Sequence, residues 1–181
     1  GVNLVQRLTK EGARVRGVYH RTPPLPIEGP VEWVQADLTL PEDCERVVQG
    51  VNHVFHCAAN TSGAAVMVKT PLVHVTPNVV MNALLLDAAY QAGTEKFLFI
   101  SSSAAYPPTG DRPVREEEMF EGDPYDVYYA VGWMKRYAEI LCNVYAQKLS
   151  KPMPTVVVRP SNVYGPYDKF DFATSHMMAA Q

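Results

Sequence analysis

The chain has 181 residues, 47% of them hydrophobic and 19% charged, with a net charge of −3. This length normally makes one domain, and the absence of a basic excess argues against a nucleic-acid partner. No apolar run reaches the roughly 18 residues of a membrane span, no signal peptide opens the chain, and three scattered cysteines give neither a zinc motif nor a disulfide framework, so we expect no metal, no membrane contact and a reducing cytoplasm.

The first third of the chain alternates between helical and strand patterns. Val2, Val5 and Leu8 recur at helical spacing and predict a helix over Val2–Glu11, which Gly12 ends. In chain order we then expect a strand at Val15–Tyr19, a proline-rich loop at Thr22–Pro30, a strand at Val31–Gln35, a short helix at Pro41–Gln49 and a buried strand at Val51–Cys57.

The same alternation continues with two long helices. The first is predicted over Pro71–Ala92, where Pro77 could introduce a kink and Gly93 stops the helix. A strand at Phe97–Ser101, a helix at Asp126–Leu149 and a strand at Thr155–Val158 follow. Apolar strands separated by helices predict an α/β fold, a doubly wound parallel sheet of about six strands covered on both sides.

Both ends of the chain look cut. A doubly wound fold begins with a strand, whereas the pattern here begins with a helix, and the last residues before Gln181 read as the first turns of another helix. We therefore expect one Rossmann-like domain over residues 1–181 that lacks its first strand and most of a C-terminal lobe.

Two segments carry the chemistry expected of this chain. Ser102-Ser103-Ala104-Ala105-Tyr106-Pro107 ends a predicted strand, and Val131-Gly132-Trp133-Met134-Lys135 lies on the next helix. Together they resemble the active site of extended short-chain dehydrogenases/reductases, the NAD(P)-dependent epimerase/dehydratase family. The resemblance covers nearly the whole chain, and its spacing is closest to the GDP-fucose synthase and GDP-mannose epimerase types. It implies an NAD(P)-dependent epimerase, reductase or dehydratase acting on a nucleotide-diphosphate sugar.

The resemblance also assigns catalytic roles. In the family a Tyr phenol moves the proton, a Lys four residues later lowers the pKa of that phenol and holds the nicotinamide ribose, and a Ser donates a hydrogen bond to the substrate oxygen. Ser102 matches the Ser, with Ser103 as second choice, and Lys135 matches the Lys. Val131 stands where the Tyr should be and has no proton to give, which leaves Tyr128, one turn earlier, as the alternative phenol.

The epimerisation residues match only in part. In enzymes of the GDP-fucose synthase type, a His at the position of His176 and a Cys just after the Ser pair move the epimerisation protons, but the Cys position here is Ala104. His176 could instead hydrogen-bond a sugar or a phosphate. Asn78 resembles an Asn that the family keeps on the long helix near the active site, although a role in helix packing is an equal reading.

The resemblance further predicts the cofactor site. Gly1 corresponds to the last glycine of the phosphate-binding turn, where the backbone approaches a pyrophosphate at a helix N-terminus. Cys57 is expected to be a small buried residue rather than a nucleophile. The other expected cofactor contacts are Asp37 and Leu38 at the adenine, Cys57, Ala58 and Ala59 after the fourth family strand, Lys135 at the ribose, and Pro160, Asn162 and Val163 in the loop after the last strand.

The end of the second family strand selects between the two cofactors. An acid at this point would favour NAD, but the chain has Tyr19-His20-Arg21, with Arg14 nearby. Because a guanidinium suits a 2′-phosphate, we expect NADP first and NAD second, with Arg21 as the main contact. The alternative is that His20 and Arg21 are solvated loop residues.

Two functional hypotheses remain open at this stage. The first is the nucleotide-sugar enzyme, with a homodimer formed through the two long helices. The second is a cofactor-binding pseudo-enzyme or regulatory module, which Val131 and Ala104 favour.

Overall fold

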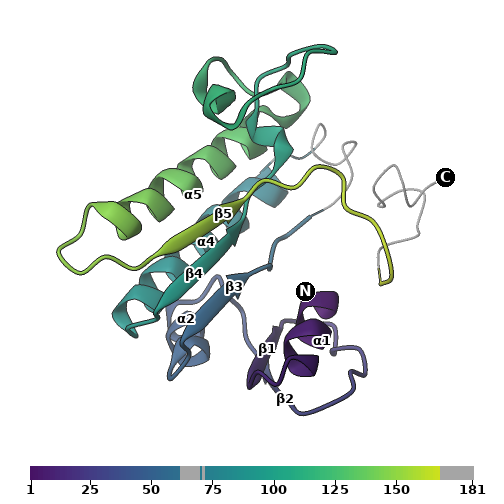
Figure 1. Cartoon of the computed structure of the whole chain (residues 1–181), viewed down its shortest axis with the longest axis vertical. Helices are drawn as coiled ribbons and strands as arrows, with labels where there is room; N and C mark the ends of the chain where they lie inside the picture. The colour runs from purple at the N-terminus through teal and green to yellow at the C-terminus, as the bar shows by residue number, and fades with distance from the viewer. Residues whose placement is uncertain (62–69, 71, 168–181) are drawn as a thin grey trace.

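The computed structural model describes residues 1–61, 70 and 72–167. The expected alternation of helices and strands is confirmed, and Figure 1 shows it along the chain. In order the elements are α1 (Val2–Lys10), β1 (Val15–Tyr19), β2 (Val31–Gln35), α2 (Pro41–Val48), β3 (His53–His56), α4 (Leu72–Gln91), β4 (Lys96–Ile100), α5 (Tyr129–Gln147) and β5 (Thr155–Val158), with short 3-10 turns at Ser103–Ala105, Glu116–Phe120 and Asp126–Tyr128.

All of these strands pair in parallel, but they form two sheets. One sheet has the order β1-β2 and the other β3-β4-β5. The expectation of one sheet of about six strands is therefore wrong for the described residues. In the usual doubly wound order, the strand before the first helix lies at the centre of the sheet. That place corresponds to the space between β1 and β3 in Figure 1, which none of the described strands occupies.

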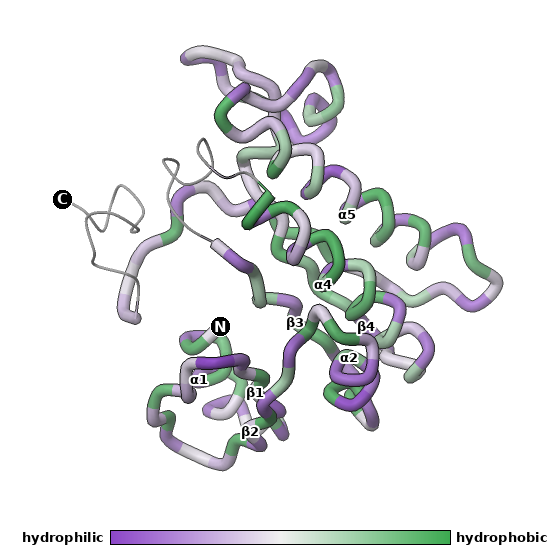
Figure 2. The backbone as a smooth tube through the Cα atoms, turned by 180° about the vertical axis from the view of Figure 1, so that it is seen from behind, coloured by the Kyte–Doolittle hydropathy of each residue, from purple (hydrophilic) through white to green (hydrophobic). Residues whose placement is uncertain are grey.

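The core lies between the three-stranded sheet and helices α2, α4 and α5. Phe97 and Phe99 of β4 point into it and are almost fully buried, together with Leu85 and Leu86 of α4. Figure 2 shows the hydrophobic parts of α4 and β4 gathered between α2 and α5. Alternate side chains of a strand point to opposite faces, which explains why an apolar run such as Phe97–Ile100 suits a sheet covered on both faces.

The other face of this sheet is open among the described residues. Phe55 of β3 and Val156 and Val158 of β5 are 38%, 40% and 41% exposed. We expected helices on both faces of the sheet. Among the described residues, they cover one face of β3-β4-β5.

Local chemistry explains the element boundaries. Gly12 and Gly93 have φ of 82° and 74°, the left-handed conformation that glycine adopts without strain, and they follow α1 and α4 as expected. Pro41 starts α2, where its missing N–H costs nothing. The helix expected from Asp126 begins later: Asp126–Tyr128 form a 3-10 turn, and α5 proper starts at Tyr129.

Helix α4 is long and apolar enough to cross a membrane by length and composition alone. Of its most hydrophobic 18-residue window, 44% is buried inside the protein. Core helices share this composition, so the observation is weak as an indication of a membrane span.

Candidate active site

The predicted serine lies at the carboxyl end of β4. Ser102 has an extended backbone, and its Oγ accepts a hydrogen bond from the Ala104 N–H at 3.1 Å, which starts the 3-10 turn. The Ser103 N–H donates to the Pro160 carbonyl at 3.1 Å. The serine turn and the loop after β5, two of the predicted site segments, are therefore in direct contact.

Helix α5 brings the predicted lysine to the same place. Lys135 Nζ donates to the Ile100 carbonyl at 2.7 Å and lies 4.8 Å from the centre of the Phe99 ring. Burial lowers the pKa of Lys135 to about 8, although the Glu139 carboxylate acts in the opposite direction. Ser102 and Lys135 Nζ thus both lie at the end of β4, the edge where ligands bind in such sheets.

A partly buried ion pair lies at the same strand end. The guanidinium of Arg159 donates to both carboxylate oxygens of Glu139, with the shortest bond at 2.8 Å. Ser101 Oγ donates to the same carboxylate at 2.5 Å, and Arg159 also donates to the Tyr106 hydroxyl at 2.7 Å. Spacing alone predicted no role for these four residues, although all of them lie within or beside the two motifs.

Close packing fixes the start of α5 against the serine turn. A side chain at Gly132 would place its Cβ 2.5 Å from Pro124 and 2.6 Å from the Ala104 carbonyl oxygen. Arg136, which is 1% exposed, donates to the carbonyls of Ala105 and Gly122, both at 2.7 Å. A charged residue in a helix usually indicates a solvated face, which is why sequence reasoning missed Arg136.

Val131, which stands where the resemblance predicts a Tyr, is half-buried on α5. Val131 stands one turn before Lys135, about 6 Å along the axis. Tyr128 lies outside the α-helix, at the end of the 3-10 turn, with its ring 6.3 Å from that of Tyr125. It is separated from Lys135 by about 10 Å of helix rise, so proton transfer near Lys135 would require this turn to move.

The turn after β3 is held by asparagines of α4 and of the turn itself. Cys57 is partly buried, burial raises the pKa of its thiol, and all three cysteines are free. Ala58 and Ala59 are exposed, which leaves their backbone open to a ligand. Asn78 forms hydrogen bonds with the backbone N–H and carbonyl of Asn60, the residue after Ala59, so its role includes shaping this turn.

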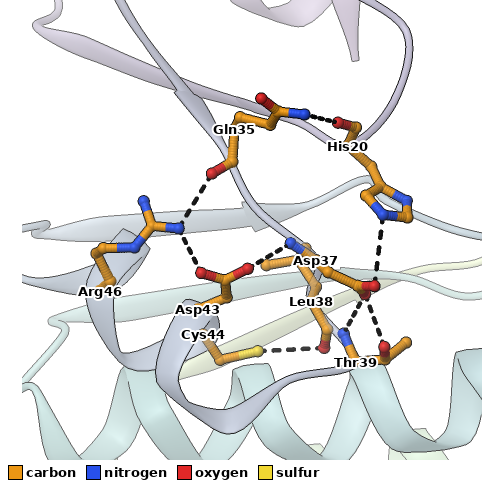
Figure 3. A network of polar contacts seen from close by, with 8 residues as sticks. All are labelled: His20, Gln35, Asp37, Leu38, Thr39, Asp43, Cys44 and Arg46. Carbon is orange, nitrogen blue, oxygen red and sulfur yellow. Dashed lines mark hydrogen bonds and ion pairs between the residues drawn. The ribbon is translucent and has the colours of Figure 1, made fainter.

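A polar network follows β2, as Figure 3 shows. Asp37 accepts hydrogen bonds from the Thr39 N–H at 3.0 Å and from the Thr39 hydroxyl at 2.6 Å, and His20 Nε2 lies 3.4 Å from its carboxylate. These hydrogen bonds and the charges of His20 and Arg21 lower the pKa of Asp37. Leu38 belongs to the core, so Asp37 is the member of this pair whose side chain is open to a cofactor.

The other predicted positions lie at the start of α1, on the loop after β5, or outside the described residues. Gly1 precedes α1 and its Cβ direction is open, with nothing within 4 Å. Asn162 and Val163 are exposed on the loop after β5, and this loop reaches α1, because Asn3 Nδ2 donates to the Pro166 carbonyl at 3.1 Å. His176 lies outside the described residues.

The cavity found in the structure lies beside this site. It has a volume of about 770 Å³ and is lined by Pro107, Thr109, Arg112, Asp123, Tyr125 and Asp126, among others, but not by Ser102, Val131 or Lys135. Its carboxylates would repel a diphosphate. Within residues 1–61, 70 and 72–167, no group of three or more His, Cys, Asp or Glu side chains could hold a metal ion.

The groups at this edge suit a dinucleotide. The exposed small residues after β3 allow close backbone approach, Asp37 offers a carboxylate acceptor, and His20 and Arg21 offer positive charge at the end of β1. The model of the NAD dependent epimerase/dehydratase family matches residues 1–181 of this chain. The chain belongs to this family. The resemblance inferred from the sequence is thereby confirmed.

Curated relatives and solved structures agree with this membership. A GDP-L-fucose synthase of Sinorhizobium fredii is 32% identical over 149 residues, 80% of this chain and 46% of the relative. A GDP-mannose 3,5-epimerase of Arabidopsis thaliana is 28% identical over 141 residues, 75% of this chain and 36% of the relative. The chain therefore spans less than half the length of these two relatives.

Two solved structures share the fold. A UDP-glucose 4-epimerase of Thermus thermophilus, in complex with NAD, is 27% identical with a TM-score of 0.76, covering 94% of this chain and 54% of its own. A GDP-L-fucose synthetase of Naegleria fowleri, bound to NADP, is 25% identical with a TM-score of 0.72, covering 84% of this chain and 52% of its own. The Rossmann-like fold is confirmed, and both nicotinamide cofactors occur among the similar proteins.

Proposed function

We propose that this chain forms the cofactor-binding part of an NAD(P)-dependent epimerase, reductase or dehydratase that acts on a nucleotide-diphosphate sugar, with NADP preferred. The observation that carries the proposal is the hydrogen bond from Lys135 to the Ile100 carbonyl. It brings the α5 lysine to the strand end that carries Ser102, at the edge of the sheet where ligands of this fold bind.

The roles of the residues follow from their chemistry. A bound nicotinamide cofactor would supply or accept the hydride. Ser102 would donate its hydroxyl hydrogen to the reacting sugar oxygen, and Lys135 would hold the cofactor ribose with a charged amine. Tyr128 would have to move the proton that accompanies hydride transfer, because Val131 has no group that can do so. His176 would move an epimerisation proton or hydrogen-bond a sugar or a phosphate.

A second function is favoured by one specific feature. Valine at position 131, together with Ala104 in place of a Cys, suits a protein that binds cofactor without redox chemistry. General acid–base catalysis contributes typically about 10²–10⁴-fold, so loss of the phenol alone could silence the reaction while binding persists.

Single-turnover measurements separate the two functions. NADPH oxidation or NADP⁺ reduction would be followed by stopped-flow fluorescence with a panel of GDP- and UDP-linked sugars, for the wild type, Val131→Tyr and Tyr128→Phe. Tyr129→Phe is the matched control, since Tyr129 is exposed at the start of the same helix.

Each result has one meaning. A fast wild type that Tyr128→Phe abolishes supports a shifted tyrosine. A slow wild type that Val131→Tyr accelerates supports a binding protein that has lost its phenol. If neither substitution changes any rate, the assignment of the active site is wrong.

The proposal includes a homodimer formed through the two long helices. Tyr129, Trp133, Tyr137 and Ile140 recur on one side of α5 and are between 39% and 53% exposed. Such a stripe on a surface helix is typical of a contact face, and a stable interface commonly needs about 800 Å² per partner. Light scattering after size exclusion should give a dimer, and Tyr137→Glu should give a monomer. A wild-type monomer would contradict this part of the proposal.

The proposal also places the protein in the cytoplasm. Cys44, Cys57 and Cys142 are all free thiols, which suits a reducing compartment. Fractionation of cells that produce the full-length protein would test this placement.

A further inference from the structure

We propose that Glu139 and Arg159 are positioning residues, whose ion pair holds the segments carrying Ser102, Lys135 and Asn162 in register and keeps the Glu139 carboxylate about one helix turn from Lys135. This inference rests on the proposed function, because the register matters for catalysis only if Ser102 and Lys135 serve the reaction.

The geometry of the pair favours positioning over stability. Arg159 Nε lies 3.0 and 3.1 Å from the two oxygens of Glu139, and the terminal nitrogen of Arg159 lies 2.8 Å from one of them. The side chain of Glu139 is 8% exposed and that of Arg159 is 21% exposed. The pair gives little reason to expect a large gain in stability, since desolvation of the buried carboxylate and of the partly buried guanidinium offsets much of their attraction, whereas the planar fork fixes orientation.

Each end of the pair holds a further segment. On the Glu139 side, the hydroxyl of Ser101 donates to the carboxylate at 2.5 Å, directly before Ser102. On the Arg159 side, the guanidinium donates to the Tyr106 hydroxyl at 2.7 Å and to the Glu116 carbonyl at 2.9 Å. The pair therefore joins both sides of the serine turn to α5 and to the start of the loop after β5.

Lys135 and Glu139 act on consecutive residues of one strand end. They stand four residues apart on α5, so they share a helix face. Lys135 binds the Ile100 carbonyl, and Glu139 binds the hydroxyl of the next residue, Ser101. A displacement of α5 along β4 would break both contacts together.

The surroundings of Lys135 contain one anion among the described residues. Its own helix presents Glu139, β3 presents His56, and β4 presents the Phe99 ring and the Ile100 carbonyl. Burial lowers the pKa of His56 to about 4, so this imidazole is neutral near pH 7. Glu139 is then the charge that opposes the effect of burial on Lys135.

A titration of Lys135 tests the electrostatic half of the proposal. The lysines of the full chain would be reductively methylated with ¹³C and their midpoints followed by NMR in the wild type, Glu139→Gln and Ser101→Ala. Glu11→Gln, in the exposed Arg7–Glu11 pair, is the matched control. We expect Glu139→Gln to lower the Lys135 midpoint by about half a pH unit or more, because it removes the facing anion. Ser101→Ala and Glu11→Gln should leave it unchanged, and an unchanged midpoint in Glu139→Gln would overturn the proposal.

Kinetics with the full-length protein test the positioning half. Arg159→Lys keeps the charge but loses the fork, and the milder Tyr106→Phe removes one hydrogen bond. We expect kcat to fall about tenfold in Arg159→Lys and less in Tyr106→Phe, while the KM for NADPH stays within about twofold. An unchanged kcat in both variants, or a parallel loss of kcat and NADPH affinity, would contradict positioning. If the wild type turns over no sugar nucleotide, the proposed function fails, while the titration still decides the electrostatic half.

Discussion

The side-chain amide of Asn78 forms two hydrogen bonds with the backbone of Asn60. Its Oδ1 accepts from the Asn60 N–H at 2.8 Å, and its Nδ2 donates to the Asn60 carbonyl at 2.9 Å. The buried amide on α4 thereby satisfies the backbone N–H and carbonyl of Asn60, which no strand in the described part of the chain pairs.

Asn78→Asp should destabilise the protein and the turn. The carboxylate keeps an acceptor but loses the donor, and it faces the Asn60 carbonyl with a negative charge. We expect a loss of about 1–3 kcal/mol in the free energy of unfolding by urea, with weaker NADPH binding at the exposed Ala58 and Ala59. Asn52→Ala, which removes a hydrogen bond to the exposed Glu95, should cost less than about 0.5 kcal/mol. Equal losses in the two variants would contradict the role assigned to Asn78.

His56 should make the protein sensitive to acid. Burial lowers the pKa of His56 from 6.5 to about 4. Between these values the unfolded chain binds a proton that the folded chain does not, so stability falls as the pH decreases from about 6.5 to about 4. The loss should be on the order of 2–3 kcal/mol.

The measurement is unfolding by urea at several pH values for the wild type, His56→Gln and His53→Gln. His53 lies on the same strand but is exposed, so its variant should keep the wild-type slope. His56→Gln should flatten the slope, since its side chain does not titrate. A wild-type slope in His56→Gln would show that other groups cause the acid sensitivity.

The helices and strands could be predicted well from the sequence, because apolar runs and glycines, the two patterns that indicate them, are local. Apolar runs such as Phe97–Ile100 and glycines such as Gly93 act within a few residues. The division of the described strands into two sheets depends on pairing between strands far apart in the sequence, which local patterns do not specify. The 3-10 turn before α5 was also missed, because Asp126–Tyr128 have ordinary helical composition.

Of the candidate site, only the residues that belong to sequence motifs could be predicted. Ser102 and Lys135 stood out by spacing, and the structure brings them to the same strand end. The ion pair of Glu139 with Arg159 joins residues twenty positions apart, and the bond of Arg136 to Ala105 spans thirty-one. Contacts at such separations follow from the packing of α5, which composition and periodicity do not specify.

Gly132→Ala should be destabilising, although alanine is the better helix former. In an open helix this change gains up to about 1 kcal/mol. Here the new Cβ would lie 2.5 Å from the Pro124 side chain and 2.6 Å from the Ala104 backbone oxygen, so α5 must move away from the serine turn. We expect a net loss of about 1–3 kcal/mol in thermal or urea unfolding. Gly122→Ala is the control, since its Cβ would meet only Pro107, at 3.4 Å. A stabilised Gly132→Ala protein would contradict the close approach of α5.

Arg21 should decide the preference for NADPH over NADH. It is exposed after β1 and forms no hydrogen bond or ion pair with any described residue, while the neighbouring Asp37 carboxylate is already bound by Thr39 and faced by His20. Its guanidinium is therefore available to a 2′-phosphate, and a charge-assisted hydrogen bond is worth about 1.5–3 kcal/mol. Calorimetric titration of Arg21→Ala should show NADPH affinity reduced about tenfold or more and NADH affinity nearly unchanged. The same titration of Arg7→Ala, which removes an exposed arginine paired with Glu11 on α1, should leave both affinities at their wild-type values. The difference between the cofactors should also shrink as salt is raised, because exposed charges are screened. Equal wild-type affinities that Arg21→Ala does not alter would show that Arg21 is a solvated loop residue and that the preference for NADP is wrong.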